Sequence, residues 1–509
     1  MNYAGLDVGT TGVKALVVNH RGDVVASSYE KYPMLMPRKG WSELDPEQIW
    51  DGCRKVLKDV TDQTRGDFEA LAVSSHAQSV ALLDKDGRTL CNFISTVDGR
   101  TDRELEFWRR TGREWEMYQR TGLPFSHIYT ANKLMWLKAN RPEIFGQAAR
   151  FMCVQDYVNW RLTGRAVMDY SLAGRGMLLN GRERRWDREI LELIGIDRAS
   201  LLELLEAGTV IGRVSPSVAK ELHLRPELLV VSGGHDQMCG CLGSGVIHAG
   251  QIMNSSGTVE VMEALSPWFV TDEEILKYHF PCTPYITGDH YLIMSINNSG
   301  GLMLWWYLNT FCSHEKALAE VNQQDPYTWM IGESADEISD VYVLPHLNGA
   351  ETPVQDPDSA CAIVHMGADT SKADITRGLL DSMAYELRLN LEAFKSLGCG
   401  AYELRAIGGG ARTPKLLQIK ADVLQIPVIT LASGESAALG AAMIGAVGIG
   451  AFPGYEAAIG SMVHISHIYE PDRRKASEYN EHFEEYKLLY PALAGFNKRI
   501  SKRMKDTRR

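Results

Sequence analysis

The sequence lacks the features that mark secreted, disulfide-bonded or membrane-spanning chains. Its nine cysteines are scattered from Cys53 to Cys399 without a CxxC pair, which favours neither a disulfide framework nor a zinc site. No basic and apolar leader with a cleavage site opens the sequence. The most apolar stretch, residues 437–452, carries several glycines and is short for a membrane span. We therefore expect a cytoplasmic protein with no membrane partner, and we interpret this stretch as a buried helix packed through small residues.

An excess of basic charge is missing as well. The formal net charge is −11, and nucleic-acid binding needs a concentrated basic face, so we expect no nucleic-acid partner. The one basic run, residues 498–509, is interpreted as a solvated helix end. Hydrophobic residues make up 45% and charged residues 23%, a balance typical of a globular enzyme. A chain of 509 residues exceeds one ordinary core, which predicts two or more domains.

Two strand-turn-strand openings, half a chain apart, organise the sequence. In each, apolar strands flank a short turn of glycines and hydroxyl residues; the predicted strands are residues 3–7, 13–18 and 23–26 in the first opening and 251–254 and 259–262 in the second. Helical patterns follow, beginning with the cap and first-position proline at Asp45 and Pro46. Alternating strands and helices predict an α/β fold. We place the domain boundary near residue 245, with domains at residues 1–245 and 246–509 and a cleft between them.

The first turn carries groups that handle phosphate. Residues 7–14 combine Asp7 with two glycines, the hydroxyls of Thr10 and Thr11, and Lys14. Glycines let backbone N–H groups point into an anion, hydroxyls add donors, and an acid beside them can hold Mg²⁺ through water. A Walker A loop is absent, because GxxxxGK[ST] does not occur and the turn joins two strands. The alternative is an ordinary glycine-rich hairpin.

Two further glycine-rich turns lie in the second half. Gly257 and Thr258 repeat the hydroxyl-and-glycine composition of the first turn, so the two turns together could cradle a triphosphate. Gly409, Gly410 and Ala411 follow a predicted strand and precede a helix, where a backbone can approach a flat ligand closely. A glycine-rich loop without a ligand is the alternative for this segment.

Asp236 is the candidate catalytic acid or base. An apolar strand ends in two glycines and then presents His235, Asp236 and Gln237, so the carboxylate lies at a strand end, where α/β folds place their ligands. Phosphoryl transfer from ATP needs an oriented nucleophile whose proton has somewhere to go, and a carboxylate can accept it. The alternative is an Asx-turn or a helix cap.

Together these motifs resemble the FGGY carbohydrate kinases, which have two actin-like (ribonuclease H-like) ATPase domains flanking a catalytic cleft. The resemblance runs nearly from end to end. It includes residues 7–14, 40–46 with Trp50, 83–87, 98–101, 130–137, 169–171, 234–236, 256–258, the glycine turn near 409 and the segment that begins at Glu435.

The resemblance implies roles for the matched positions. Asp236 would be the catalytic base, and Asp7 would hold Mg²⁺ through water. ATP would contact the two phosphate turns and the adenosine turn; the residues implied are Thr10, Thr11, Lys14, Gly257, Thr258, Gly409, Gly410 and Ala411. A small-molecule sugar or polyol would be the other substrate, and a homodimer is one assembly consistent with the family.

The sugar itself stays open. The substrate-binding candidates are His76, Gln78, Asp98, His235 and Asp236. Xylulokinases have Met-His where this chain has Ala77-Gln78, and they commonly have Trp-Asn before the position of Asp98. The segment around Asp236 is more similar to the L-fuculokinase and rhamnulokinase branch, whereas residues 40–46 are similar to xylulokinase or gluconokinase. We therefore expect a sugar kinase for a small ketose or polyol.

A second hypothesis comes from a different class of protein. An actin-like ATP site could serve a nucleotide-dependent sensor or scaffold that has lost sugar phosphorylation. Asp236 separates the two hypotheses, because a nucleotide switch has no need of a carboxylate at the acceptor position. Its presence favours the enzyme.

Overall fold

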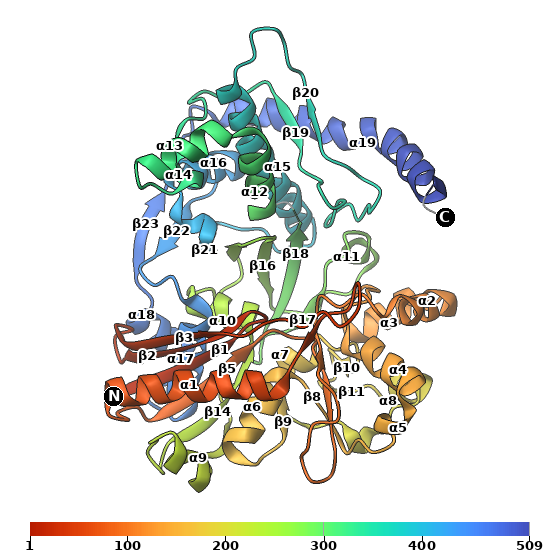
Figure 1. Cartoon of the computed structure of the whole chain (residues 1–509). Helices are drawn as coiled ribbons and strands as arrows, with labels where there is room; N and C mark the ends of the chain where they lie inside the picture. Colours follow the sequence, from red (N-terminus) through yellow and green to blue (C-terminus); the bar gives the residue numbers. More distant parts are fainter. Residues whose placement is uncertain (299, 508–509) are drawn as a thin grey trace.

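Two mixed sheets, each with helices packed on it, make up the computed structural model, which describes residues 1–298 and 300–507 (Figure 1). The first sheet has the order β13-β14-β5-β1-β2-β3, with β1 (Asn2–Val8), β2 (Gly12–Asn19), β3 (Val24–Lys31), β5 (Ala70–Ser75), β13 (Val210–Arg213) and β14 (Leu229–His235). The second has the order β17-β18-β16-β15-β21-β22-β23, with β15 (Gln251–Ser256), β16 (Glu260–Ser266), β17 (Cys282–Pro284), β18 (Tyr291–Asn297), β21 (Glu403–Gly408), β22 (Val428–Leu431) and β23 (Ile465–Tyr469).

Helices pack around these two sheets, and several short two-stranded sheets lie beside them. The main helices are α1 (Pro46–Thr64), α2 (Asp102–Thr111), α3 (Glu114–Thr121), α4 (Thr130–Asn140), α6 (Val154–Thr163), α8 (Arg188–Ile194), α10 (Asp236–Gly243), α12 (Gly301–Phe311), α13 (Ser313–Val321), α14 (Pro326–Gly332), α15 (Lys372–Ser396), α16 (Pro414–Leu424), α17 (Ser436–Gly448), α18 (Tyr455–Met462) and α19 (Ala476–Thr507). Shorter elements include α7 (Tyr170–Ala173), α9 (Pro216–Glu221), α11 (Glu273–Lys277), β9 (Val167–Asp169), β10 (Leu179–Asn180) and β11 (Arg185–Trp186). The α/β fold predicted from the sequence is confirmed.

The two sheets repeat one topology. In the first, β1, β2 and β3 form an antiparallel meander, while β5 and β14 join the other side of β1 in parallel. In the second, β15, β16 and β18 form the meander, while β21 and β22 join β15 in parallel. Both strand-turn-strand openings predicted from the sequence are therefore confirmed, and each forms the centre of its sheet.

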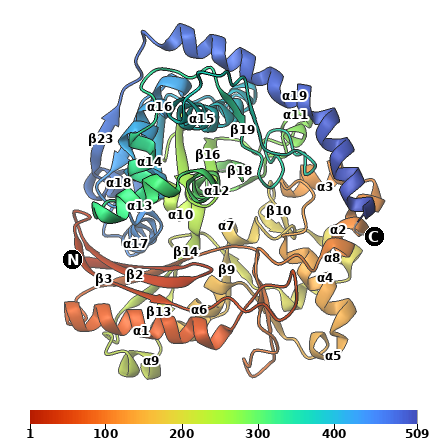
Figure 2. The same ribbon diagram turned by 45° about the horizontal axis from the view of Figure 1, so that its top comes forward.

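The helix predicted after Asp45 is also present. The Asp45 side chain accepts a hydrogen bond from the Glu47 backbone N–H, and Pro46 occupies the first helical position, where no N–H is required. The buried side of α1 packs on β2 and β3. At the other end of the chain, α19 runs along the outside of the second half against α15 and α16, and residues 498–506 of the basic run lie mostly exposed along its last turns (Figure 2).

The apolar stretch at residues 437–452 forms the buried helix that its composition predicts. Helix α17 packs against α10 and against β1, β5 and β14 of the first sheet, although it comes late in the chain. A Cβ on Gly440 would lie 1.9 Å from the Cys239 carbonyl oxygen of α10, so the two helices touch through their backbones. This crossing ties the second half of the chain to the first sheet. No helix in the described part of the chain is long and apolar enough to cross a membrane.

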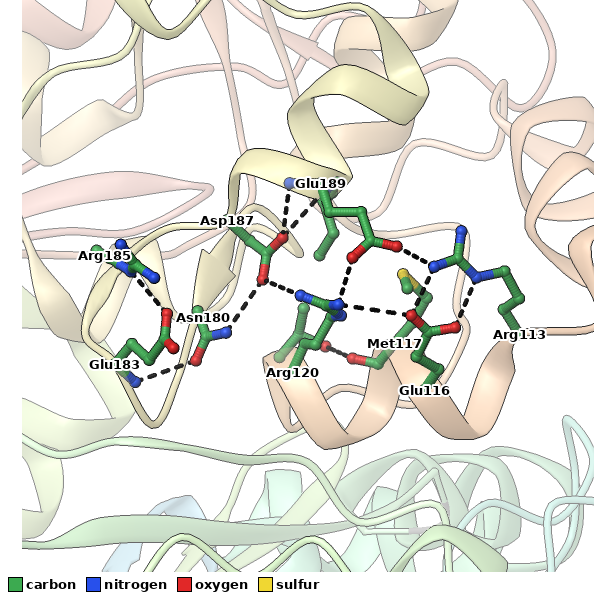
Figure 3. Close-up of polar contacts among 11 residues, drawn as sticks. Arg113, Glu116, Met117, Arg120, Asn180, Glu183, Arg185, Asp187 and Glu189 are labelled. Carbon is green, nitrogen blue, oxygen red and sulfur yellow. Dashed lines mark hydrogen bonds and ion pairs between the residues drawn. The ribbon is translucent and has the colours of Figure 1, made fainter.

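A network of ion pairs joins α3 to α8 (Figure 3). Arg113 donates to Glu116 at 2.6 Å and also pairs with Glu189, which Arg120 contacts as well. Arg120 reaches Asp187, the residue that caps α8, at 3.3 Å. The far end of α3 meets the second half, where the Cys282 N–H donates to the Gly122 carbonyl at 2.8 Å. The network therefore holds a helix that contacts both halves.

The crossing of α10 and α17 predicts a steric effect. We expect Gly440→Ala to lower the free energy of unfolding by about 1–3 kcal/mol, because the added methyl would overlap a backbone carbonyl that cannot rotate away. Gly495→Ala is the matched control, since this glycine lies exposed in α19 with no atom within 4 Å of an added Cβ. The control should stabilise slightly. Equal thermal midpoints for the two variants would contradict the close crossing.

Candidate active site

Three parallel strands, β14, β5 and β1, bring most of the candidate residues together. Asp7 lies opposite Ser74 across one pairing, and Ser75 lies opposite His235 across the other. Because parallel strands end at the same edge of a sheet, Asp7, His76 and Asp236 come together where these strands stop. Residues separated by more than 200 positions in the sequence thus form one cluster.

Asp236 is the first residue of α10 and is partly buried, with 26% of its side chain exposed. Its Oδ1 accepts from the Gln237 backbone N–H at 2.7 Å and lies 3.1 Å from His235 Nε2. The pKa of Asp236 is raised to about 7. Burial is the main cause, and the nearby Asp7 carboxylate adds to the shift. The helix N-cap is His235, so Asp236 does not serve as the cap that was the alternative interpretation.

Asp7 provides a second carboxylate beside Asp236. Ser74 Oγ donates to its Oδ1 at 2.9 Å. Burial raises the pKa of Asp7 to about 6, with a further contribution from Glu435, while the Ser74 hydrogen bond and Lys14 oppose the shift. Two carboxylates that resist ionisation make a site that a cation would stabilise, and carboxylate oxygens are suitable Mg²⁺ ligands. The described residues contain no group of three or more metal-ligating side chains, so water and phosphate oxygens would complete the coordination.

Both candidate histidines are neutral. Burial lowers the pKa of His76 to about 4, and its Nδ1 lies 3.1 Å from the Val8 carbonyl oxygen, to which it donates. That bond leaves His76 Nε2 as a buried acceptor without a partner in the described structure. Burial likewise holds the pKa of His235 well below its usual value. The neutral His235 ring therefore lies beside the Asp236 carboxylate without a charge of its own.

Gln78 and Asp98 are both buried and are held by hydrogen bonds from other parts of the first half. Gln78 is 4% exposed and has a φ of 64°, an uncommon backbone conformation that the Lys133 ammonium stabilises by donating to the Gln78 carbonyl at 2.9 Å. The Asp98 carboxylate is fully buried, and it accepts from the Ser42 N–H at 2.6 Å and from the Arg100 guanidinium at 2.8 Å. Protein donors thus already occupy both of its oxygens.

The turn at residues 9–12, the first of the two predicted phosphate turns, is closed by its own backbone. The Gly9 N–H donates to the Gly12 carbonyl at 2.9 Å, and the Tyr32 hydroxyl donates to the Gly9 carbonyl at 2.5 Å. Thr11 is exposed and Thr10 is half-buried on this turn. Lys14 lies on β2 and pairs with Glu435, the residue before α17, at 2.5 Å.

The second phosphate turn and the glycine turn line a cavity of about 750 Å³. Gly257, Thr258, Gly409 and Gly410 form one side. Trp305 and Tyr327 add aromatic faces, and Leu304, Ile331, Met383 and Leu416 add apolar surface. An elongated ligand with a flat aromatic part suits this lining. Ala411 packs against the neighbouring core and does not line the cavity.

Sequence reasoning missed the polar network beneath the second turn. Lys420 is 1% exposed, and its Nζ donates to Asn254 Oδ1 at 2.8 Å and to Ser256 Oγ at 2.9 Å, while Glu260 neutralises it. The network fixes Ser256 at the start of the turn. A lysine at a buried position of the apolar helix α16 is the one signal that could have indicated it.

A short path connects this cavity with the Asp236 cluster. Arg412 lines the cavity, and its Nη2 lies 3.9 Å from the position of a Cβ on Gly434. Glu435 follows directly and pairs with Lys14, which lies directly opposite Asp7 in the pairing of β1 with β2. A ligand bound in the cavity through a planar group could therefore extend toward Asp7 and Asp236.

The chain is similar to known carbohydrate kinases along its whole length. It is 27% identical over 501 residues to a xylulose kinase from Bacillus subtilis, covering 98% of each chain. It is also 27% identical over 480 residues to a gluconokinase from the same organism, covering 93% of each chain. The crystal structure of xylulose kinase from Rhodospirillum rubrum superimposes with a TM-score of 0.89 at 25% identity, over 98% of this chain and 100% of that one.

Models of protein families match both halves of the chain. The N-terminal domain of the FGGY family of carbohydrate kinases matches residues 2–243, and the C-terminal domain of that family matches residues 252–449. The two matches cover more than half of the chain and contain the Asp236 cluster and the glycine turns. The chain therefore belongs to the FGGY family of carbohydrate kinases, with the two actin-like domains of that family.

Proposed function

We propose that this kinase transfers the γ-phosphate of Mg-ATP to a hydroxyl of a small sugar, with Asp236 as the general base. One observation carries the proposal: the Asp236 carboxylate is partly exposed at the joint end of three parallel strands, and its pKa is raised to about 7. A base with a pKa near the working pH combines a large ionised fraction with a useful proton affinity. The neutral His235 lies beside the carboxylate, with Nε2 3.1 Å from Oδ1.

The chemical step follows from this arrangement. Asp236 accepts the proton of the sugar hydroxyl while the hydroxyl oxygen forms a bond to the γ-phosphorus. The bond between that phosphorus and the bridging oxygen breaks, and ADP leaves. Transition states of this kind depend on positioning and on stabilisation of charge on the phosphate oxygens.

The remaining predicted residues would bind ATP. Thr10, Thr11 and Lys14 would contact phosphate oxygens from the first turn, and Gly257 and Thr258 would do so from the second. Gly409 and Gly410 would lie against the adenosine, with Ala411 supporting their turn from the core. Asp7 would hold Mg²⁺ through water, and the ion would neutralise charge on the phosphates when bound.

The substrate side of the pocket is proposed to contain His76, Gln78, His235 and Asp236. His76 Nε2 is a buried acceptor suited to a sugar hydroxyl. Because the Asp98 carboxylate is occupied by Arg100 and Ser42, we assign it a supporting role for the loop that precedes the pocket. The relatives described above include a xylulose kinase and a gluconokinase. Their names leave two chemical classes of acceptor to consider, neutral ketoses and aldonates.

Division into residues 1–245 and 246–509 remains a proposal about domains that move. The N-terminal family model ends at residue 243 and the C-terminal model begins at residue 252, which supports a domain boundary near residue 245. Helix α17 returns to the first sheet, so any hinge must include the crossing of α10 and α17. A nucleotide-dependent scaffold without sugar phosphorylation is less well supported, since it would have no use for Asp236.

Replacing Asp236 tests its role as the base. We expect Asp236→Asn to lower kcat by roughly 10²- to 10⁴-fold, because the hydroxyl proton loses its acceptor. Binding of a non-hydrolysable ATP analogue, measured by calorimetry, should change little. Asp86→Asn is the control, because Asp86 is exposed in a surface turn. Near-normal turnover of Asp236→Asn would remove the residue from this role.

The pH dependence of kcat/KM provides an independent test. The basic form of Asp236 is needed, and its pKa is raised to about 7, so activity should be constant above that pH and fall below it. Protonation of Asp7, with a pKa of about 6, should steepen the fall at lower pH. A profile measured from pH 5 to 9 should show this acidic limb. A profile flat from pH 5.5 upward would contradict the raised pKa.

Asp7→Asn should impair the use of Mg-ATP more than sugar binding. We expect a higher Mg²⁺ requirement and a kcat reduced by about 10²-fold or more, because charge on the phosphates is less well neutralised. The substitution also removes a negative charge that raises the Asp236 pKa, so the acidic limb of the remaining activity should move to lower pH. Unchanged Mg²⁺ dependence at a wild-type rate would exclude Asp7 from metal binding.

A further inference from the structure

Arg175 is a buried cation without a carboxylate partner. It lies in the turn after α7 and is 4% exposed. No carboxylate oxygen of the described residues comes within 4.0 Å of its guanidinium. Two other guanidiniums, on side chains that are each 3% exposed, are paired: Arg377 with Asp381 at 2.9 Å and Arg100 with Asp98 at 2.8 Å. Arg175 is therefore an exception that needs a reason, since an uncompensated buried charge is costly.

The groups around Arg175 do not neutralise it. Its Nε and Nη2 lie 3.3 and 3.2 Å from the Gln78 side-chain oxygen, in the amide orientation that satisfies both groups. Nη2 also lies 3.9 Å from Met294 Sδ, and Tyr129 is close by. Nη1 is buried and has no hydrogen-bond partner in the described structure. One strong donor of a buried cation is thus left for a ligand.

Two acids approach this cation without serving as its counterion. Glu263 is fully buried and accepts from the Cys241 thiol at 2.9 Å, and burial raises its pKa to about 8, which keeps most of it neutral at physiological pH. Asp236 must change its protonation state during catalysis, so it cannot be a permanent partner. The positive charge is available to the bound substrate.

Arg175 also lies on the substrate side of the site. It is close enough to Asp236 and His235 to influence the pKa of both, and it contacts Gln78 directly. Lys133, which is fully buried, holds the other side of Gln78 through its carbonyl. The turn that carries Arg175 leads into β10, where Asn180 donates to Asp187 of the ion-pair network at 3.1 Å (Figure 3). The cation is therefore held rigidly beside the catalytic base.

From this geometry we infer that the acceptor substrate carries a carboxylate, as an aldonate does, and that Arg175 binds it. The inference rests on the proposed function and specifies its substrate class. The carboxylate accepts from Nη1, His76 Nε2 accepts from a hydroxyl, and Asp236 receives the proton of the hydroxyl that is phosphorylated. A charge-assisted bond of this kind, formed in a dry pocket, distinguishes an acid from its neutral analogue.

Matched substrates test the inference without any variant. Gluconate, gluconamide and glucitol differ only at C1, and xylonate and xylitol form a second set, with D-xylulose as the neutral ketose. Release of ADP should give the aldonates a kcat/KM on the order of 10²-fold above that of their neutral analogues. A neutral ketose or alditol as the best acceptor would overturn the inference and leave the kinase intact. Failure to phosphorylate any acceptor would contradict the proposed function itself.

Variants of Arg175 identify the group that reads the carboxylate. Arg175→Gln should lower kcat/KM for the aldonates on the order of 10²-fold and that for the neutral analogues much less. Arg175→Lys should recover part of the loss. Arg182→Gln is the control, because Arg182 is exposed in the same segment. An equal loss for charged and neutral acceptors, with an unchanged thermal midpoint, would show that Arg175 acts only through the structure.

Calorimetry separates substrate binding from turnover. Gluconate, titrated in the presence of a non-hydrolysable ATP analogue, should bind the wild-type protein and the Arg182→Gln control with equal affinity and bind Arg175→Gln weakly. Equal affinities for all three proteins would overturn the assignment of Arg175. If Arg175→Gln does not fold, the comparison of gluconate with gluconamide on the wild-type protein decides the question.

Discussion

Parallel pairing of β14, β5 and β1 is the constraint on which the site depends. The three strands stop at one edge, and that edge receives Asp7, His76, His235 and Asp236 from three distant parts of the chain. Their backbone hydrogen bonds are satisfied inside the sheet, so the side chains at the strand ends can lie in a largely dry pocket. The repeat of this topology in the second sheet places Ser256 and Gly408 at the equivalent edge, beside the large cavity.

Burial sets the chemistry of this edge. A carboxylate in water has too low a pKa to be an efficient base, whereas desolvation and the neighbouring Asp7 raise the pKa of Asp236 to about 7. The same low dielectric keeps both histidines neutral, which makes them hydrogen-bonding groups and not charges. It also makes an unpaired Arg175 conspicuous, because each other buried guanidinium discussed above has a carboxylate within 3 Å.

The two halves communicate through backbone contact. Gly440 of α17 lies against the Cys239 carbonyl of α10, and α10 begins with Asp236 itself. Glu435, at the start of α17, pairs with Lys14 beside the first phosphate turn. A change in the angle between these helices would therefore alter the distance between Asp236, the proposed base, and Lys14 beside the proposed phosphate turn.

Local patterns in the sequence were enough to predict the repeated strand-turn-strand openings, the α/β class, the cap at Asp45 and the strand that presents Asp236, because these depend on neighbouring residues. The same patterns predicted the glycine turns. They could not show that Lys420 supports the second turn, that Asp98 is already occupied by Arg100, or that α17 packs on the first sheet. Nor could they distinguish Arg175, which has no carboxylate partner among the described residues, from Arg377, which pairs with Asp381. Those properties depend on which distant residues become neighbours, and on how much water is excluded around a charge, and only the tertiary structure decides both.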